Sequence, residues 1–384
     1  MMNFELATAA RILFGAGKIN DLPAIARGFG RRTLLVTGRD SLRAASFKQA
    51  LEGAGVSCRT FSVPGEPTLP IVRDGVLACR DGCEFVISFG GGSVIDAGKA
   101  IAALTPNSGE PLDYLEVIGK GQQLQNPLLP FIAVPTTAGT GSEVTRNAVL
   151  GSPEHGLKAS LRHPAMLARV AVVDPELTSN LPPHLTANTG LDALTQLIEP
   201  FVSCRANALV DLFCREGIKQ VASSLLTAYE NGGDRHARES MAFASLLGVL
   251  SLANAGLGVV HGMASPLGGM LSAPHGAICA ALLPQAMAMN IRALRERAPD
   301  RPALAKYEEA ARILTGNREA RAEDATQWIV ELCTRLAVGS LGDLGLHRDQ
   351  IPVLVENAQK TSSMTANPLP LTEAEIAEIA ERSW

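Results

Sequence analysis

Short apolar runs alternate with longer amphipathic stretches over the first half of the chain. Four runs are continuously apolar until they reach glycine, proline or polar residues, at 33–38, 83–92, 130–142 and 170–178. Runs of this kind are typical of strands in a sheet that is covered on both faces. Residues 41–55 and 93–105 have the apolar spacing of helices. The alternation therefore predicts a mostly parallel α/β sheet.

The pattern changes near residue 180, where the strand signals fade. Helical spacing and length recur in five later segments, at 185–203, 207–229, 237–256, 325–338 and 372–384. Glycines and prolines such as Gly232 and Pro274 separate the helical stretches. The pattern predicts an α/β domain over residues 1–182 and an all-helical domain over residues 183–384.

Composition narrows the possible functions. Hydrophobic residues make up 46% of the 384 residues and charged residues 19%, which is enough apolar surface for a large core. The net charge of −4, the 4% aromatic content and the lack of a basic block argue against nucleic-acid binding. We expect no membrane span, because no run of about 20 uninterrupted apolar residues occurs. Seven scattered cysteines and an N-terminus unlike a signal peptide favour the cytoplasm.

A glycine-rich turn joins the second predicted strand to the helix that follows it. Three glycines at 90–92 let the backbone approach a phosphate, and the helix N-terminus presents unpaired N–H groups. Ser93 is placed either to cap the helix or to bind a phosphate oxygen. The spacing fits neither G-x-G-x-x-G, because Ile95 replaces the last glycine, nor the P-loop, because Ala100 follows the Gly-Lys pair. A phosphate-binding loop and a plain tight turn both remain open.

A second polar loop, PTTAGTGSEVT at residues 135–145, follows the third predicted strand. Its small and hydroxyl-bearing side chains are suited to line a ribose and nicotinamide pocket without filling it. An ordinary polar loop is the alternative interpretation.

Residues that commonly bind metals occur in the helical half. Asp192 and Gln196 are four residues apart and share a helix face, while His261 and His275 flank a glycine-rich segment. Two imidazoles and a carboxylate form a suitable donor set for a divalent cation. The alternatives are a cap or salt bridge for Asp192 and a hydrogen-bonded core imidazole for His261. Neither G-x-S-x-G nor H-E-x-x-H occurs to suggest hydrolytic chemistry.

Together these motifs resemble the iron-containing (group III) alcohol dehydrogenases, within the dehydroquinate-synthase-like fold. The resemblance extends over most of the chain, through segments 14–17, 90–99, 113–114, 135–145, 158, 174–178, 190–199, 261–284 and 367–376. It implies a parallel-sheet nicotinamide-binding domain followed by a helical domain for metal and substrate. It also implies reversible hydride transfer between NAD(P) and a small alcohol, aldehyde or ketone, in a homodimer or larger homo-oligomer.

The resemblance implies a role for individual residues. The positions that match its pyrophosphate loop are Gly91, Gly92, Ser93 and Asp96. Those that match its nicotinamide and ribose loop are Thr136, Thr137, Thr140 and Ser142. Lys158 matches a lysine near the cofactor, and Leu177 matches a cofactor-packing position. The implied metal ligands are Asp192, Gln196, His261 and His275. All of these except Gln196 are also the implied catalytic residues.

The chain departs from the family's pattern at several of these positions. Gln196 stands where the fourth ligand is normally histidine, and Ser265 replaces a second histidine that is a plausible proton shuttle. Gly38 and Arg39 stand where an acidic residue often binds the adenosine ribose, which favours NADP, while Asp40 keeps NAD possible. Iron(II) and zinc(II) both suit the donor set.

Three alternative functions remain open at this stage. A metal-free reductase resembling maleylacetate reductase fits the loss of histidine at position 196, and it would recruit cations such as Arg205, Arg215 and Lys219 for a dicarboxylate. Ordinary helix-surface charge also explains those three residues. The others are a non-catalytic nucleotide-binding protein and a lyase acting on a sugar phosphate, for which no convincing arginine set is visible.

Overall fold

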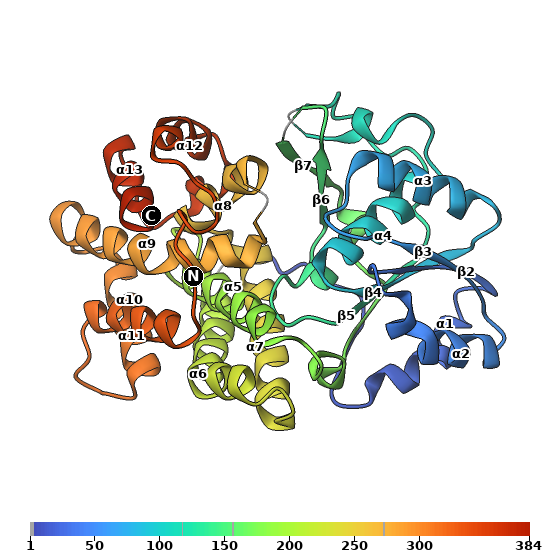
Figure 1. The fold of residues 1–384 in the computed structure, drawn as a ribbon, viewed down its shortest axis with the longest axis horizontal. Helices are drawn as coiled ribbons and strands as arrows, with labels where there is room; N and C mark the ends of the chain where they lie inside the picture. The colour runs from blue at the N-terminus through green and yellow to red at the C-terminus, as the bar shows by residue number, and fades with distance from the viewer. Residues whose placement is uncertain (1–3, 117, 156, 272) are drawn as a thin grey trace. The chain divides into compact units, whose positions relative to one another are not determined.

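The computed structural model describes residues 4–116, 118–155, 157–271 and 273–384, in two compact units (Figure 1). The α/β unit consists of Thr8–Thr137 and Gly141–Thr178. The helical unit consists of Ser179–Trp384, the short segment Ala138–Thr140 and the described residues before Thr8. Compact units are not the same as independently folding domains, so the domain boundary between residues 182 and 183 stays a prediction.

The α/β unit is built on a six-stranded parallel sheet. Its strands, in the order in which they pair, are β1 (Ile12–Phe14), β8 (Val170–Val173), β5 (Phe131–Pro135), β4 (Phe85–Gly90), β2 (Arg32–Thr37) and β3 (Ser57–Ser62). Every pairing in this sheet is parallel. The predicted fold class, a parallel sheet followed by a helical region, is confirmed.

Helices cover both faces of this sheet (Figure 1). Helices α1 (Leu22–Ala26) and α2 (Ala45–Gly53) pack on the face that presents Phe85, Ile87 and Phe89. Helices α3 (Leu69–Arg80) and α4 (Gly92–Leu104) lie on the other face. A Cβ at Gly98 of α4 would lie 1.9 Å from the Ser88 Oγ, so only glycine lets this helix approach β4 so closely.

Four strands of the α/β unit have no counterpart among the predicted strands. Strands β1 and β3 form the two edges of the sheet, and β3 is mostly polar and exposed, so it lacks a continuous apolar run. Strands β6 (Asn147–Ser152) and β7 (Leu157–Arg162) form a separate antiparallel hairpin. The strand predicted over 130–142 ends at Pro135, because small polar loop residues follow it.

The helical unit contains α5 (Pro183–Val202), α6 (Ala208–Glu230), α7 (Arg235–Ala255), α8 (Val259–Met270), α9 (His275–Arg297), α10 (Pro302–Thr315), α11 (Ala322–Arg335), α12 (Ile351–Gln359) and α13 (Glu373–Arg382). The five predicted helical segments correspond to α5, α6, α7, α11 and α13. Buried apolar side chains from these helices form one continuous core. Helices α8, α9, α10 and α12 complete the unit.

Among the described residues, α9 is the single helix that is long and apolar enough to cross a membrane unaided. Within its apolar window, 72% of the helix is buried inside the protein, as expected for a core helix. Helices α7 and α8 pass the same test only as a pair, and they are bent by 98° at their junction.

Candidate functional site

Three loops predicted to bind the cofactor leave the same edge of the sheet. Because β2, β4 and β5 are adjacent and parallel, their carboxyl ends lie side by side. Gly38 follows β2, Gly91 follows β4 and Thr136 follows β5. The Thr136 backbone N–H donates to the Gly90 carbonyl at 3.0 Å, which ties the second and third loops together. Ligands of open α/β sheets bind at this edge.

The glycine-rich turn leads directly into α4. Gly91 is the residue that precedes the helix, and no side chain caps the helix there, so Ser93 does not act as a cap. A Cβ at Gly90 would lie 2.6 Å from the Val94 side chain, which only glycine avoids. The first N–H groups of a helix have no acceptor within the helix, and with the helix dipole they favour an anion. Gly92 and Ser93 supply these first N–H groups.

A buried charged cluster, Asp96–Lys99–Glu143, lies behind this turn. The Asp96 Oδ2 accepts from the Val149 N–H at 3.0 Å, and the Asp96 Oδ1 is 3.7 Å from the Lys99 Nζ. Lys99 also donates to the Thr145 Oγ1 at 2.9 Å. Burial raises the pKa of Asp96, lowers the pKa of Lys99 and raises the pKa of Glu143 to about 7. Asp96 thus has partners inside the protein, and its role toward a pyrophosphate stays a prediction.

The remaining predicted cofactor residues lie in separate surroundings. The Lys158 Nζ on β7 is 3.4 Å from the Glu66 Oε2. Leu177, in a short helical turn after β8, packs on the core of the α/β unit. Ser142 is buried in that unit, whereas Thr140 belongs to the helical unit. Thr137 is the last residue of the α/β unit before the chain enters the helical unit at Ala138–Thr140.

The loop after β2 carries the residues that bear on cofactor choice. Arg39 is exposed, and its Nε donates to the Pro64 carbonyl at 3.3 Å. The Asp40 Oδ1 accepts from the Leu42 N–H at 3.0 Å and caps a short helical turn. The acidic side chain of this loop is therefore engaged in holding the loop itself, while the guanidinium is exposed.

The helical unit brings together three residues that are far apart in the sequence. Asp192 lies in the middle of α5, His261 on α8, and His275 is the first residue of α9. The Asp192 Oδ1 is 3.4 Å from the His261 Nε2 and 4.0 Å from the His275 Nε2. Gln196 lies one turn beyond Asp192, and its Oε1 is buried without a hydrogen-bond partner.

Glu199 is a positioning residue that the sequence reasoning missed. Its Oε2 is 2.7 Å from the His261 Nδ1, and its Oε1 accepts from the Val260 N–H at 2.7 Å. A carboxylate at Nδ1 holds the proton there and leaves Nε2 free to act as a ligand. Glu199 is seven residues after Asp192 on α5, a spacing that returns to the same helix face and was the available signal.

The Asp192 carboxylate is fully buried, and neither of its oxygens has a hydrogen-bond partner. Burying a charge without a partner is costly, so such a group calls for a cation. Burial raises the pKa of Asp192, but the nearby imidazoles of His261 and His275 outweigh it and lower that pKa. The donor set and the unpartnered oxygens fit a divalent cation.

Cys279 is a further member of this cluster. Its Sγ is 3.5 Å from the His275 Nε2, and one ligand atom from each of Asp192, His261, His275 and Cys279 lies within 4.8 Å of the others. Mainly through the charge of Cys279, the pKa of His275 is raised to about 8. Burial raises the pKa of Cys279, but the two imidazoles outweigh burial and lower it.

The basic residues that suggested a dicarboxylate substrate have local partners. The Arg215 Nε is 2.5 Å from the Glu309 Oε1, and its guanidinium lies over the Phe201 ring. Arg205 donates to the Thr365 Oγ1 at 2.8 Å. The exposed Lys219 pairs with Glu216 at 3.8 Å. These contacts match the interpretation as ordinary surface charge.

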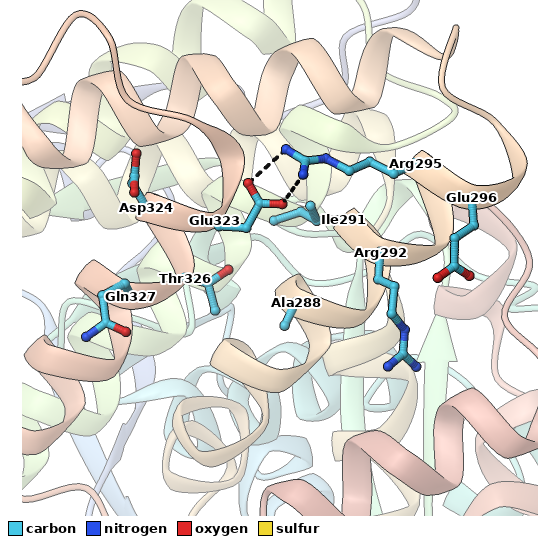
Figure 2. A pocket seen from close by; sticks show the side chains of 9 residues that line it. All are labelled: Ala288, Ile291, Arg292, Arg295, Glu296, Glu323, Asp324, Thr326 and Gln327. Carbon is cyan, nitrogen blue, oxygen red and sulfur yellow. Dashed lines mark hydrogen bonds and ion pairs between the residues drawn. The ribbon is translucent and has the colours of Figure 1, made fainter.

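A separate hollow of about 520 Å³ lies between α9 and α11 (Figure 2). Its most prominent cation, Arg295, forms an ion pair with Glu323 at 2.7 Å across the hollow, as Figure 2 shows. Arg292 pairs with Glu378 at 2.5 Å. The two arginines that line this hollow are thus neutralised by local carboxylates.

Comparison with known proteins adds an independent finding. The family model described as iron-containing alcohol dehydrogenase matches residues 9–175, and the model of the family's C-terminal region matches residues 186–384. Alcohol dehydrogenase 4 of Schizosaccharomyces pombe is 35% identical, over 96% of this chain and 86% of its own length. A crystal structure of 1,3-propanediol oxidoreductase is similar over all of both chains, with a TM-score of 0.92 and 33% identity. Sulfoacetaldehyde reductase from Bifidobacterium kashiwanohense, in complex with NAD+, covers 99% of this chain and 98% of its own, with a TM-score of 0.87 and 29% identity.

Proposed function

Because the chain belongs to the iron-containing alcohol dehydrogenase family, we propose that it transfers hydride reversibly between a nicotinamide nucleotide and a small alcohol, aldehyde or ketone, assisted by a divalent cation. As a member of that family it is an oxidoreductase that acts on CH–OH donors. The non-catalytic alternative is therefore set aside. The dependence on nucleotide and cation is the proposal.

The fully buried Asp192, whose two oxygens have no hydrogen-bond partner, is the observation that carries the proposal. Two imidazoles face it from other helices at 3.4 and 4.0 Å. A role as a helix cap would have given its oxygens backbone donors, whereas its neighbours are imidazoles, which commonly bind metals. Asp192, His261 and His275 would hold the cation, which when bound supplies Lewis-acid polarisation of the substrate oxygen.

The chain's own side chains set the charge and orientation of this centre. Asp192 places one negative charge against the cation. Glu199 keeps the proton of His261 on Nδ1, so that Nε2 faces Asp192. His275 is less enclosed, with 37% of its side chain exposed, and marks the side from which a substrate reaches the centre.

The nucleotide would bind along the carboxyl edge of the sheet. The N-terminus of α4, at Gly92 and Ser93, would bind the pyrophosphate through backbone N–H groups. The small side chains of Thr136 and Thr137 would accommodate the nicotinamide and its ribose. We propose NADP as the preferred form, because the exposed Arg39 suits a 2′-phosphate and Asp40 is engaged as a cap.

Replacing Gly38 with aspartate tests the cofactor proposal. A carboxylate there would repel a 2′-phosphate and bind ribose hydroxyls, so the ratio of kcat/KM for NADPH to that for NADH should fall about tenfold or more. Steady-state assays with both nucleotides measure this ratio. A wild-type enzyme that already prefers NADH would contradict the choice of NADP and leave the hydride-transfer proposal intact.

Metal analysis with activity assays tests the proposed function itself. The protein is purified without chelators, its metal content is measured, and NADPH and NADH oxidation is assayed with an aldehyde panel before and after EDTA. About one iron or zinc per chain, with activity lost on stripping and restored by metal, is the expected result. Activity that is unchanged in metal-free protein would refute the proposed role of the cation. It would favour the metal-free reductase that resembles maleylacetate reductase.

We also propose a cytoplasmic homodimer or larger homo-oligomer, on the family resemblance. The seven cysteines are all unpaired, which fits a reducing compartment. Light scattering after size-exclusion chromatography would contradict the oligomer if it gave the 40.3 kDa mass of a single chain.

A further inference from the structure

We propose that the Cys279 thiolate, and not the Gln196 amide, is the fourth protein ligand of the cation held by Asp192, His261 and His275. The inference rests on the proposed function and concerns which side chain completes its metal site. Cys279 lies one turn beyond His275 on α9, whereas Gln196 lies one turn beyond Asp192 on α5. The fourth donor of this chain would thus lie on α9, and not on α5, where the family resemblance implies it.

The geometry of the four donor atoms supports this assignment. Bonds of about 2.0 Å to nitrogen or oxygen and about 2.3 Å to one sulfur place tetrahedral ligand atoms about 3.3 to 3.5 Å apart. The His261 Nε2 is 3.4 Å from the Asp192 Oδ1, and the Cys279 Sγ is 3.5 Å from the His275 Nε2. The widest separation within the set is below 4.8 Å, so small side-chain shifts close it around an ion.

Burial and charge favour the thiolate further. Cys279 is fully buried, beside a fully buried Asp192 whose two oxygens have no partner. A divalent cation between one carboxylate and one thiolate is neutralised by its ligands, which lowers the cost of burying it. The amide oxygen of Gln196 is neutral, so as the fourth ligand it would not reduce the charge of the cation. The Cys279 thiol would then lie beside the ion without binding it.

A sulfur donor also changes which cation the site prefers. Thiolate and imidazole suit zinc, whereas magnesium and manganese prefer oxygen donors. We therefore expect the site to select zinc strongly over magnesium and manganese, and to release its Cys279 proton when the metal binds. Competition between these cations measures that preference directly.

Cobalt(II) substitution of the whole protein tests the ligand by spectroscopy, without reference to catalysis. Wild-type protein loaded with cobalt should show a near-ultraviolet thiolate-to-cobalt charge-transfer band, and X-ray absorption of the zinc form should show one sulfur at about 2.3 Å. Cys279→Ser should abolish both signals and weaken zinc binding at least tenfold. Cys333→Ser is the matched control, because its thiol lies near the Ala280 carbonyl, next to Cys279 in the chain, and should leave both signals unchanged.

A double variant separates ligand loss from misfolding. Cys279→Ser combined with Gln196→His should regain zinc affinity while the charge-transfer band stays absent. Stoichiometric cobalt without that band in the wild type, or a band that survives Cys279→Ser, would overturn the thiolate assignment and leave the proposed function standing. Failure of the wild type to take up any cation, with full activity, would overturn both.

Discussion

The two units each bury a cluster of charged side chains, and the clusters differ in where their cation comes from. In the α/β unit, Asp96 and Glu143 share the buried Lys99, whose ammonium also donates to backbone and hydroxyl oxygens. In the helical unit, Asp192 lies in a cluster with two imidazoles and a thiol. The first cluster contains its own permanent cation, and for the second we propose that a bound ion supplies the cation.

This difference shows that burial alone does not mark a metal site. Both clusters contain buried carboxylates with displaced pKa values. What distinguishes Asp192 is that, among the described residues, its ion-pair partners are imidazoles and not a lysine or an arginine. Removing a partner should therefore cost stability in the α/β unit and cost metal and activity in the helical unit.

Asp192→Asn should have the largest effect. The substitution keeps the shape of the side chain and removes its charge, so metal should be lost and kcat/KM should fall at least about a thousandfold. Metal analysis and steady-state kinetics measure both. Asp211→Asn makes the same change in a helical-unit ion pair with Lys306 and should retain both properties. Near-normal metal content and kcat/KM in Asp192→Asn would remove the contrast between the clusters.

Lys99→Met should destabilise the α/β unit strongly. It leaves Asp96 and Glu143 buried without their cation, so the free energy of unfolding should fall by about 3 to 5 kcal/mol. Urea denaturation measures this loss. Lys120→Met removes an exposed ion pair with Asp113 and should have a much smaller effect. Equal losses in the two variants would contradict a structural role for the buried ammonium.

Glu143→Gln should remove a pH dependence of stability. Burial raises the pKa of Glu143 from 4.5 to about 7. Between these values the folded protein retains a proton that the unfolded chain has lost. This contribution to the free energy of unfolding is full below about pH 4.5 and declines as the pH rises to about 7.

The wild type should therefore lose up to about 3 kcal/mol relative to Glu143→Gln between about pH 5 and pH 8. Urea midpoints of both proteins at the two pH values give the difference. A difference that does not change with pH would mean that Glu143 is ionised throughout, and that the α/β cluster carries one more charge than proposed.

Glu199→Gln should have the smallest of these effects. It keeps a hydrogen-bond acceptor for His261 but removes the charge that strengthens this imidazole as a ligand. Metal affinity should fall about tenfold to a hundredfold, with folding unchanged. A zinc competition titration measures it. Unchanged affinity would mean that the contact between Glu199 and His261 serves the packing of α5 against α8 and does not tune the centre.

The sequence predicts the features that are encoded locally. The run from Phe85 to Leu104 contains a buried strand, a glycine turn and a helix in immediate succession, so its pattern is legible without tertiary information. The long helices α5, α6 and α7 are legible for the same reason. Strand β3 is not, because an exposed edge strand needs no apolar run and is held by its pairing with β2.

The metal cluster could be predicted only in part, because its members converge by packing. Asp192 and His275 are separated by more than eighty residues, and spacing cannot place them 4.0 Å apart. Residue type and spacing singled out those two, His261 and Gln196, the family resemblance then assigned them as ligands, and neither drew attention to Cys279. The interval of four residues from His275 to Cys279 was visible, but a buried cysteine on an apolar helix resembles any other core residue.

The short segment Ala138–Thr140 has a consequence for dissecting the protein. The chain leaves the α/β unit for these three residues and returns at Gly141, so the two units are interleaved along the polypeptide. Gly139 lies so close to Thr189 of α5 that a Cβ would approach the Thr189 side chain within 2.6 Å. A cut between residues 182 and 183 keeps the whole α/β unit in the first fragment, but it separates Ala138–Thr140 and the other early residues of the helical unit from the rest of that unit. The helical fragment alone should therefore fold poorly, and expressing both fragments together should restore its folding.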